Sequence, residues 1–299
     1  MTKTQHGIIA CVIGATSWGF NGVVSQFLLS HYTVEPSWLA SIRMCLAGLF
    51  LTLMVWPTKK AEIRLMLHDP ISLRQLILFA LFGLILSQFS YLSAIKNSNA
   101  GTATVLQTLS VVFMSLYLAV RFHKPPTTRE IISVFLAFGG VYLAATDGTP
   151  STMVISPLGL TWGLIGAIAC VTYPVLSQGL AANWGAAVAN GLGMMIGGLF
   201  LSVSCQVWTL WPVLDLTGWL AVAFIIIIGT ALSFTAFVTG ISEIGPMKAT
   251  LLGTLEPVIA SVISAIALGT TFHTAELIGY ACIIATVFII ILQKKPAIS

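Results

Sequence analysis

Residues 7–26 read GIIACVIGATSWGFNGVVSQ, and residues 159–178 read GLTWGLIGAIACVTYPVLSQ. Both stretches are free of Lys, Arg, Asp and Glu, and each has about the 20 residues that an apolar helix needs to cross a bilayer. Laying the first on the second matches Gly7 with Gly159, Ile13-Gly14-Ala15 with Ile165-Gly166-Ala167, Val23 with Val175, and Ser25-Gln26 with Ser177-Gln178. The chain therefore carries one kind of membrane helix twice.

A second internal match lies later in each half. Residues 103–109, ATVLQTL, align with residues 249–255, ATLLGTL, with five identities in seven positions. Without a gap, the same shift lays Glu130 on Glu276, and both residues follow the predicted start of a helix, which indicates a capping role. Two matches in the same order indicate a duplicated unit.

The composition places this unit in a membrane. Of the 299 residues, 57% are hydrophobic and only 7% are charged, whereas soluble proteins are about 25% charged. Apolar windows predict ten transmembrane helices, at residues 7–29, 37–56, 75–95, 99–120, 129–146, 157–179, 186–207, 217–240, 247–268 and 274–292. The predicted fold class is an all-α integral membrane protein.

The ten spans divide into two units of five. Residues 1–150 form the first five-helix repeat, and residues 151–299 form the second. Because five is an odd number, the second unit enters the membrane from the opposite side, so the repeat must be inverted. Inverted repeats surround a cavity near the bilayer midplane, an architecture typical of secondary transporters. We therefore expect one transport unit around a central cavity.

The basic residues predict the orientation. In alternate loops, Lys and Arg gather on the side of the N-terminus, above all in the predicted loop of residues 57–74 with Lys59, Lys60, Arg64 and Arg74, whereas Lys96 stands alone on the other side. Cytoplasmic loops carry such an excess, so we expect both termini in the cytoplasm and the chain in the inner (plasma) membrane. The net charge of +4 then reflects topology and contact with anionic lipid headgroups, and no nucleic-acid partner is expected.

Groups for metal or enzyme chemistry are scarce inside the spans. The histidines lie in loops or at helix ends, no Asp lies within a span, and no HExxH motif occurs. We therefore expect no metal site, no cofactor and no intramembrane enzyme. The cysteines lack paired spacing, which is typical of small packing residues; they are Cys11, Cys45, Cys170, Cys205 and Cys282.

Three motifs resemble one transporter family. They are Ser41-Ile42-Arg43-Met44 in the second span, Asn99-Ala100-Gly101-Thr102-Ala103 at the start of the fourth, and Leu255-Glu256-Pro257-Val258 in the ninth. Together with the two five-span halves, they resemble the EamA-type branch of the drug/metabolite transporter (DMT) superfamily over the whole chain. Within that branch, the third motif and the aromatic content are most similar to the YddG-type aromatic amino-acid exporters.

This resemblance implies alternating access and a central cavity lined by spans 1, 3, 4, 6, 8 and 9. It also implies small metabolites as substrates, including amino acids, nucleosides and drugs. Many members of the family carry a Gly-Glu pair just after spans 4 and 9, but here Arg121-Phe122-His123-Lys124 and Gly269-Thr270 stand there. No role of that glutamate carries over to this chain.

Glu256 is the acidic candidate for substrate binding. Counted from Lys248 at the cytoplasmic end of the ninth span, it lies ~12 Å deep. An intramembrane carboxylate is typical of a functional site, here for a substrate ammonium group or a proton. The alternatives are a protonated acid bonded to a neighbouring helix and a partner for Arg43. Pro257 follows directly and is a candidate hinge, because proline interrupts helical hydrogen bonding.

Arg43 is the basic candidate for substrate binding. It lies ~8 Å below Trp38 at the outer face, and its guanidinium can bind a substrate carboxylate through two N–H groups. The alternative is a side chain that reaches the outer headgroups or fastens the second span to a neighbour. The depth between Arg43 and Glu256, ~10 Å, is near the limit for direct pairing.

Aromatic and amide side chains inside the spans complete the candidates. Amides avoid lipid, so they face the interior of the bundle and either bind substrate or bond another helix. The substrate-binding candidates of this kind are Trp18, Asn21, Gln88, Tyr91, Gln107, Trp162 and Tyr173. Gly22 and Pro174 are equivalent in the repeat and are candidate hinges, with close packing as the alternative.

Two functions fit these residues. The first is a secondary transporter that exports amphipathic metabolites, with aromatic and other bulky amino acids as the expected substrates, because Arg43 and Glu256 supply one charge for each end of a zwitterion. The second is proton-coupled efflux of cationic drugs through Glu256. In either case we expect a monomer whose partners are its small-molecule substrate and the lipid bilayer.

Overall fold

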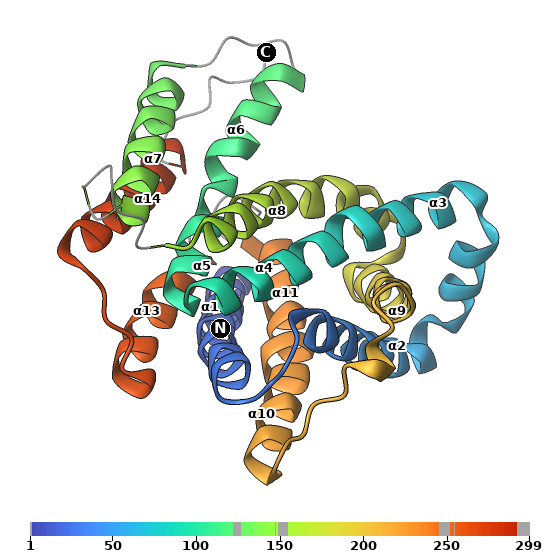
Figure 1. Ribbon diagram of the computed structural model, residues 1–299. Helices are drawn as coiled ribbons and strands as arrows, with labels where there is room; N and C mark the ends of the chain where they lie inside the picture. The colour runs from blue at the N-terminus through green and yellow to red at the C-terminus, as the bar shows by residue number, and fades with distance from the viewer. Residues whose placement is uncertain are drawn as a thin grey trace.

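The computed structural model describes residues 2–121, 127–146, 148, 155–244, 252–253 and 255–291. The described residues form helices joined by short connections, so the all-α fold class is confirmed (Figure 1). Seven of the described helical stretches are long and apolar enough to cross a membrane, and three shorter apolar helices accompany them. Their outward faces carry strongly exposed apolar side chains, such as Phe135 and Ile266, that suit contact with lipid.

The predicted spans coincide with the observed helices. The first half contains α1 (Lys3–His31), α2 (Pro36–His68), α3 (Pro70–Leu78), the π-helix η1 (Phe79–Ile85), α4 (Leu86–Asn97), α5 (Ala100–Thr108), α6 (Ser110–Arg121) and α7 (Thr128–Thr146). The second half contains α8 (Pro157–Trp184), α9 (Ala186–Ser204), the 3-10 turn η2 (Val207–Thr209), α10 (Leu216–Ile226), the π-helix η3 (Ile227–Leu232), α11 (Ser233–Ile244), α13 (Leu255–Leu268) and α14 (Thr274–Ile291). Most of the ninth span before α13 lies outside the described residues.

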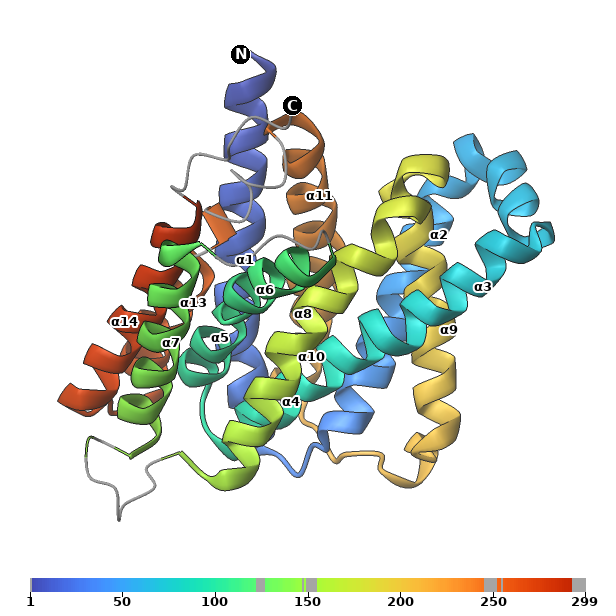
Figure 2. The same ribbon diagram turned by 90° about the horizontal axis from the view of Figure 1, so that it is seen from above.

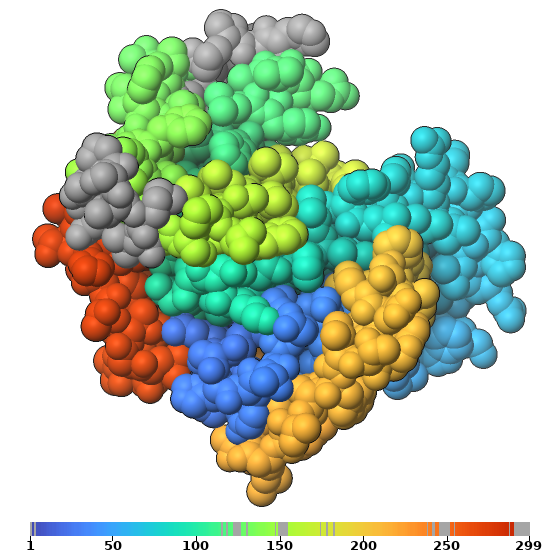
Figure 3. Space-filling view, in the orientation of Figure 1, coloured from blue at the N-terminus to red at the C-terminus, as the bar shows by residue number. Residues whose placement is uncertain are grey.

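Helix packing follows the repeat. α2 packs on its equivalent α9 at one side of the molecule, and α7 packs on its equivalent α14 at the other (Figures 1 and 2). Between these pairs, α1 packs on α11 and α13, just as α8 packs on α4 and α5. On the face drawn in Figure 3, the blue surface of α1 lies between the blue-green surface of α4 and α5 and the gold surface of the segment that leads into α10.

Small residues allow the helices to approach closely. A Cβ added to Gly48 on α2 would lie 2.6 Å from the backbone nitrogen of Met195 on α9. At the other side, a Cβ on Gly279 of α14 would lie 2.5 Å from the carbonyl oxygen of Gly140 on α7. Such contacts are the usual basis of helix association inside a bilayer, where apolar burial between helices gains little.

Residues 57–68 and 70–74 are helical, with Asp69 between the two helices, so the expectation of a loop over residues 57–74 was wrong. α2 continues through Pro57 to His68 because its last turns are amphipathic. Ile63 and Met66 are buried there, and Lys59 Nζ lies 2.6 Å from Glu62 Oε1. Hydropathy detects only the part of a helix that lies in the membrane, so it could not show this extension.

Glu276 has a larger role than the predicted cap. Its Oε2 accepts a bond from the backbone N–H of His273 at 3.3 Å, as a capping residue does. However, the side chain is also buried, and its Oε1 accepts bonds from the hydroxyls of Thr102 on α5 and Tyr280 on α14. Glu276 therefore joins α14 to α5 as well as capping α14.

A polar cluster around Gln26 joins three helices. Gln26 Nε2 donates to Thr270 Oγ1 at 3.0 Å, just beyond α13. Gln26 Oε1 accepts from the backbone N–H of Ala100 at 2.8 Å, the first residue of α5, and from Ser264 Oγ on α13 at 2.8 Å. The amide thus supplies partners for groups at the ends of two other helices, where backbone N–H groups lack helical partners.

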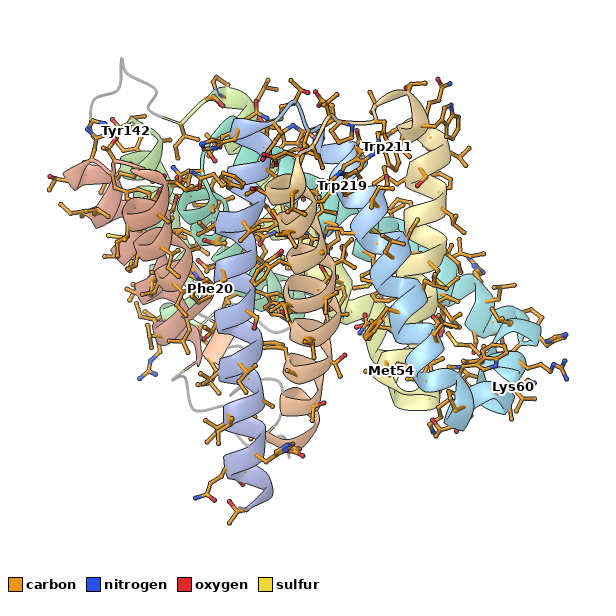
Figure 4. All side chains as sticks on the ribbon, turned by 90° about the horizontal axis from the view of Figure 1, so that it is seen from below. Phe20, Met54, Lys60, Tyr142, Trp211 and Trp219 are labelled. Atoms are coloured by element: carbon orange, nitrogen blue, oxygen red, sulfur yellow. The ribbon has the colours of Figure 1, made fainter. Side chains whose placement is uncertain are left out.

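The ends of the bundle differ in character. Figure 4 shows Trp211 and Trp219 at one end and Met54 and Lys60 at the opposite end. The two tryptophans pack with the buried ring of Trp38, at centroid distances of 5.5 and 6.3 Å. The tryptophan pair at one end and Lys60 at the other are compatible with the predicted topology, in which the end with Trp211 and Trp219 faces outward.

Candidate functional site

A cavity of about 160 Å³ lies among seven helices near the centre of the bundle. α1, α2, α4, α5, α8, α11 and α13 contribute to it, which are the six spans that the family resemblance implies together with the second span. The lining residues are Trp18, Asn21, Arg43, Ser87, Gln88, Tyr91, Gln107, Cys170, Tyr173, Phe234 and Glu256.

The structure brings eight of the nine predicted substrate-binding residues to this cavity. The exception is Trp162, which is half-buried and packs edge-to-face on Phe89 at 5.2 Å. Trp162 lies three helical turns from Tyr173 on α8, ~16 Å along the axis. Trp162 was predicted from its residue type, but its position along α8 places it outside the cavity.

The two charged candidates share the cavity without forming an ion pair. The ion pairs between described residues are His6–Glu243, Lys59–Glu62 and Lys96–Glu35, and neither Arg43 nor Glu256 takes part in them. Both side chains nevertheless line the same cavity. The cavity therefore contains a basic group and an acidic group that are not paired with each other.

Several buried polar atoms of the site lack partners among the described residues. Arg43 is 2% exposed, and its Nε and Nη1 make no hydrogen bond within the described part of the chain; the same holds for Tyr91 Oη and Asn21 Oδ1. Buried polar groups are nearly always paired, and an unpaired buried charge is costly. A polar ligand or water in the cavity would supply the missing partners.

One wall of the cavity is aromatic. The Phe234 ring lies 5.1 Å from Trp18 and 6.2 Å from Tyr173, and Trp18 also contacts Phe237 at 4.6 Å. Tyr173 is held in place by a 3.0 Å bond from its hydroxyl to Asn190 Oδ1 on α9. These rings offer a substrate an apolar surface with preferred edge-to-face geometries.

The candidate hinges lie beside the cavity. A Cβ on Gly22 would lie 2.5 Å from Tyr91 Oη, so this glycine makes room for a cavity side chain. Pro257 is buried in the first turn of α13, next to Glu256, where proline costs no helical bond. α8 continues as an α-helix through Pro174, whose side chain lies outside the described part of the structure.

Sequence reasoning missed three lining residues, Ser87, Cys170 and Phe234. The repeat itself carries the signal for two of them. The shift that lays Gly7 on Gly159 lays Trp18 on Cys170, and the shift that lays Ala103 on Ala249 lays Gln88 on Phe234. Trp18 and Gln88 therefore each point, through the inverted repeat, to a second lining residue.

Comparison with known proteins agrees with this architecture. The model of the EamA-like transporter family matches residues 5–146 and again residues 157–292. The chain belongs to the EamA-like transporter family. Members of this family are transporters and not enzymes, so the chain is a membrane transporter of the EamA type.

Similar proteins carry the same general description. The chain is 30% identical to the "uncharacterized inner membrane transporter YicL" of Salmonella typhimurium (strain LT2), over 99% of this chain and 98% of the relative. It is 26% identical to the "uncharacterized transporter YyaM" of Bacillus subtilis (strain 168), over 87% of each chain. One solved crystal structure matches with a TM-score of 0.62 and 17% identity, over 96% of this chain and 95% of the other, which shows a shared fold alone.

Proposed function

We propose that this EamA-type transporter exports zwitterionic amino acids, chiefly aromatic and other bulky ones, by alternating access. The observation that carries the proposal is that a basic and an acidic side chain, Arg43 and Glu256, line one cavity without forming an ion pair, while guanidinium nitrogens of Arg43 have no partner among the described residues. A substrate carboxylate would bind Arg43 through charge-assisted hydrogen bonds. The substrate ammonium group would bind Glu256.

The remaining wall suits the side chain of the substrate. Trp18, Tyr173 and Phe234 form its aromatic part, and Gln88 and Gln107 add amide groups. The volume of about 160 Å³ is below the ~300–1,000 Å³ of pockets for drug-sized ligands. A small metabolite therefore fits better than a bulky drug. The resemblance of Leu255-Glu256-Pro257-Val258 to YddG-type exporters, an expectation from the sequence, implies the same substrate class.

The rival function is proton-coupled efflux of cationic drugs through Glu256. Arg43 is an argument against it, because a buried guanidinium in the same cavity repels a cationic ligand in a medium of low dielectric constant. A cation would gain from Glu256 and lose to Arg43, whereas a zwitterion gains from both.

The test is competition for uptake of labelled phenylalanine into proteoliposomes. Phenethylamine lacks the carboxylate and 3-phenylpropionate lacks the ammonium group, so both should compete much more weakly than unlabelled phenylalanine. Arg43→Gln should abolish the discrimination against phenethylamine, and Arg64→Gln, which removes an exposed cation of α2, should retain it. Strong competition by tetraphenylphosphonium, together with transport only under a pH gradient, would favour the drug antiporter.

Export needs a separate measurement, because uptake into vesicles does not report direction in the cell. Cells that express the chain and are preloaded with labelled phenylalanine should lose it faster than cells that express Arg43→Gln. Equal loss from both would argue against export of this substrate.

A further inference from the structure

Two π-helical segments occupy equivalent places in the two halves. η1 precedes α4 in the third span, and η3 precedes α11 in the eighth. The shift that lays Ala103 on Ala249 also lays Gly83 of η1 on Gly229 of η3. π-helices are rare and are frequent at functional sites, so a matched pair beside the cavity calls for a physical explanation.

Side-chain hydroxyls hold η3 in its wide register. Thr230 Oγ1 donates to the carbonyl oxygen of Ile225 at 2.8 Å, and Ser233 Oγ donates to that of Ile228 at 2.5 Å. Both bonds reach five residues back, and both side chains are fully buried. In the α-helix that follows, Thr235 Oγ1 bonds the carbonyl of Ala231, four residues back. The two hydroxyls therefore match the π spacing and not the α spacing.

The register of η3 decides which side chain of α11 faces the cavity. A π turn holds about one residue more than an α turn, and each residue of an α-helix is rotated ~100° from the last. Conversion of η3 to α-helix would therefore rotate α11 and bring Ser233 toward the place of Phe234. The cavity would lose the ring that lies between Trp18 and Tyr173.

Each π segment also contacts the site through its glycine. An ideal Cβ on Gly229 would overlap the side chain of Asn21. A Cβ on Gly83 would lie 2.9 Å from the Phe79 ring, which packs on Tyr173, and 3.4 Å from the Cα of Tyr173 itself. Asn21 and Tyr173 are equivalent in the repeat. The same arrangement thus supports a lining residue in each half.

We propose that Thr230 and Ser233 are positioning residues of the transport site, whose hydroxyls keep η3 in π register and thereby keep Phe234 in the cavity against the substrate. The proposal rests on the proposed function for the identity of the substrate. The placement of Phe234 in the cavity does not depend on that identity.

A double-mutant cycle tests the proposal on transport. Phe234→Ala should raise the KM for phenylalanine about 3- to 10-fold, the scale of one aromatic contact. Thr230→Val with Ser233→Ala should raise KM similarly, and adding Phe234→Ala to that pair should cause little further change, because the ring has already left the cavity. Thr230→Ser keeps a hydroxyl and should retain the wild-type KM. Independent, additive effects of the two sets of changes would overturn the proposal.

Cysteine labelling tests the same point without a substrate. In a variant that lacks the five native cysteines, Phe234→Cys should react readily with a small water-soluble thiol reagent. Addition of Thr230→Val and Ser233→Ala should slow this reaction several-fold, whereas Thr235→Val, the matched loss of a hydroxyl in α11, should leave it unchanged. Thr230→Val alone is the milder variant if the double change yields too little folded protein.

The two measurements separate the two proposals. If the wild-type protein moves no amino acid but the labelling of Phe234→Cys slows as expected, the proposed function fails and the positioning role stands. If amino-acid transport is confirmed but the labelling rate is unchanged by loss of both hydroxyls, the positioning role is wrong.

Discussion

Arg43 is a fully buried cation that the described protein groups leave partly unpaired. Burying a charge without partners costs several kcal/mol, so such an arrangement persists where a ligand or water completes it. Glu256 lines the same cavity but forms no ion pair with Arg43. The open distance between them is the space in which the proposed substrate would bind.

The neutral variant Glu256→Gln separates the two functions at the level of one residue. In a gradient-driven carrier, Gln still accepts a bond from the substrate ammonium group, so transport should remain measurable with an apparent affinity weaker by about 1 to 3 kcal/mol. In a proton antiporter the acid must gain and lose a proton in each cycle, so Gln would abolish uptake. Uptake of phenylalanine with and without a pH gradient, in wild type and variant, measures this. A wild type that needs the gradient, with an inactive variant, would contradict the carrier.

The aromatic wall gives a second prediction, with a control in the same chain. Trp18→Ala should impair transport of phenylalanine more than that of alanine, because it removes a ring from the cavity. Trp162→Ala removes the same side chain outside the cavity and should alter transport of both substrates alike, in proportion to the amount of folded protein. Equal substrate profiles for the two variants would assign Trp18 to packing.

Residue type and depth predicted most of the candidate site. Charges, amides and rings inside spans are expensive in lipid, so they had to face the interior, and eight of them line one cavity. Ser87, Cys170 and Phe234 are small or apolar and are tolerated in contact with lipid. Their residue types therefore did not indicate that they line the cavity. Trp162 shows the converse, because a costly residue type also occurs away from the cavity.

At the scale of helices, Gln26 acts as a remote cap. Its Oε1 satisfies the first N–H of α5, and its Nε2 reaches the residues just after α13. The cost of an amide in lipid predicted that Gln26 faces the interior, but the sequence could not predict the partner helices. The π-helices were equally beyond it, since a change from 3.6 residues per turn within an apolar span leaves composition unchanged.

Replacement of Gln26 tests this connection. Gln26→Leu should lower the thermal unfolding midpoint of the purified protein, because it leaves the Ala100 N–H without a partner and removes two hydroxyl contacts, at about 1 to 3 kcal/mol. Gln75→Leu changes an exposed amide of α3 and should leave the midpoint unchanged. Identical midpoints for the two variants would show that the cluster contributes nothing to stability.

For the whole molecule, the fold could be predicted from the sequence because the internal repeat and the hydropathy pattern both indicate two units of five spans. Ten apolar windows, two internal matches and an odd number of spans per half led to the inverted architecture, and the packing of α1 on α11 mirrors that of α8 on α4. The helical continuation of α2 after Pro57 was missed because it depends on an amphipathic pattern outside the membrane.

The orientation in the membrane is a prediction from the basic residues, and it is open to a direct test. On a cysteine-free background, Ala61→Cys in the basic end of α2 should resist an impermeant thiol reagent added to intact cells. Val213→Cys, a strongly exposed position between α9 and α10, should react under the same conditions. The opposite result for both positions would invert the topology.

The two halves share the same arrangement of helices but contribute different side chains to the cavity wall. Trp18 corresponds to Cys170, Asn21 to Tyr173, and Gln88 to Phe234, so the inward-open and outward-open states expose different chemistry to an arriving substrate. The KM measured from the cytoplasmic side should therefore differ from that measured from outside.

For an uncoupled carrier, equilibrium requires the ratio Vmax/KM to be the same in both directions, so the side with the higher KM must also have the higher Vmax. Oriented proteoliposomes can measure both constants, and equal KM values would contradict the expectation. With unequal values, the protein would rectify: at saturating substrate, net movement in one direction would be faster than in the other without any coupling ion.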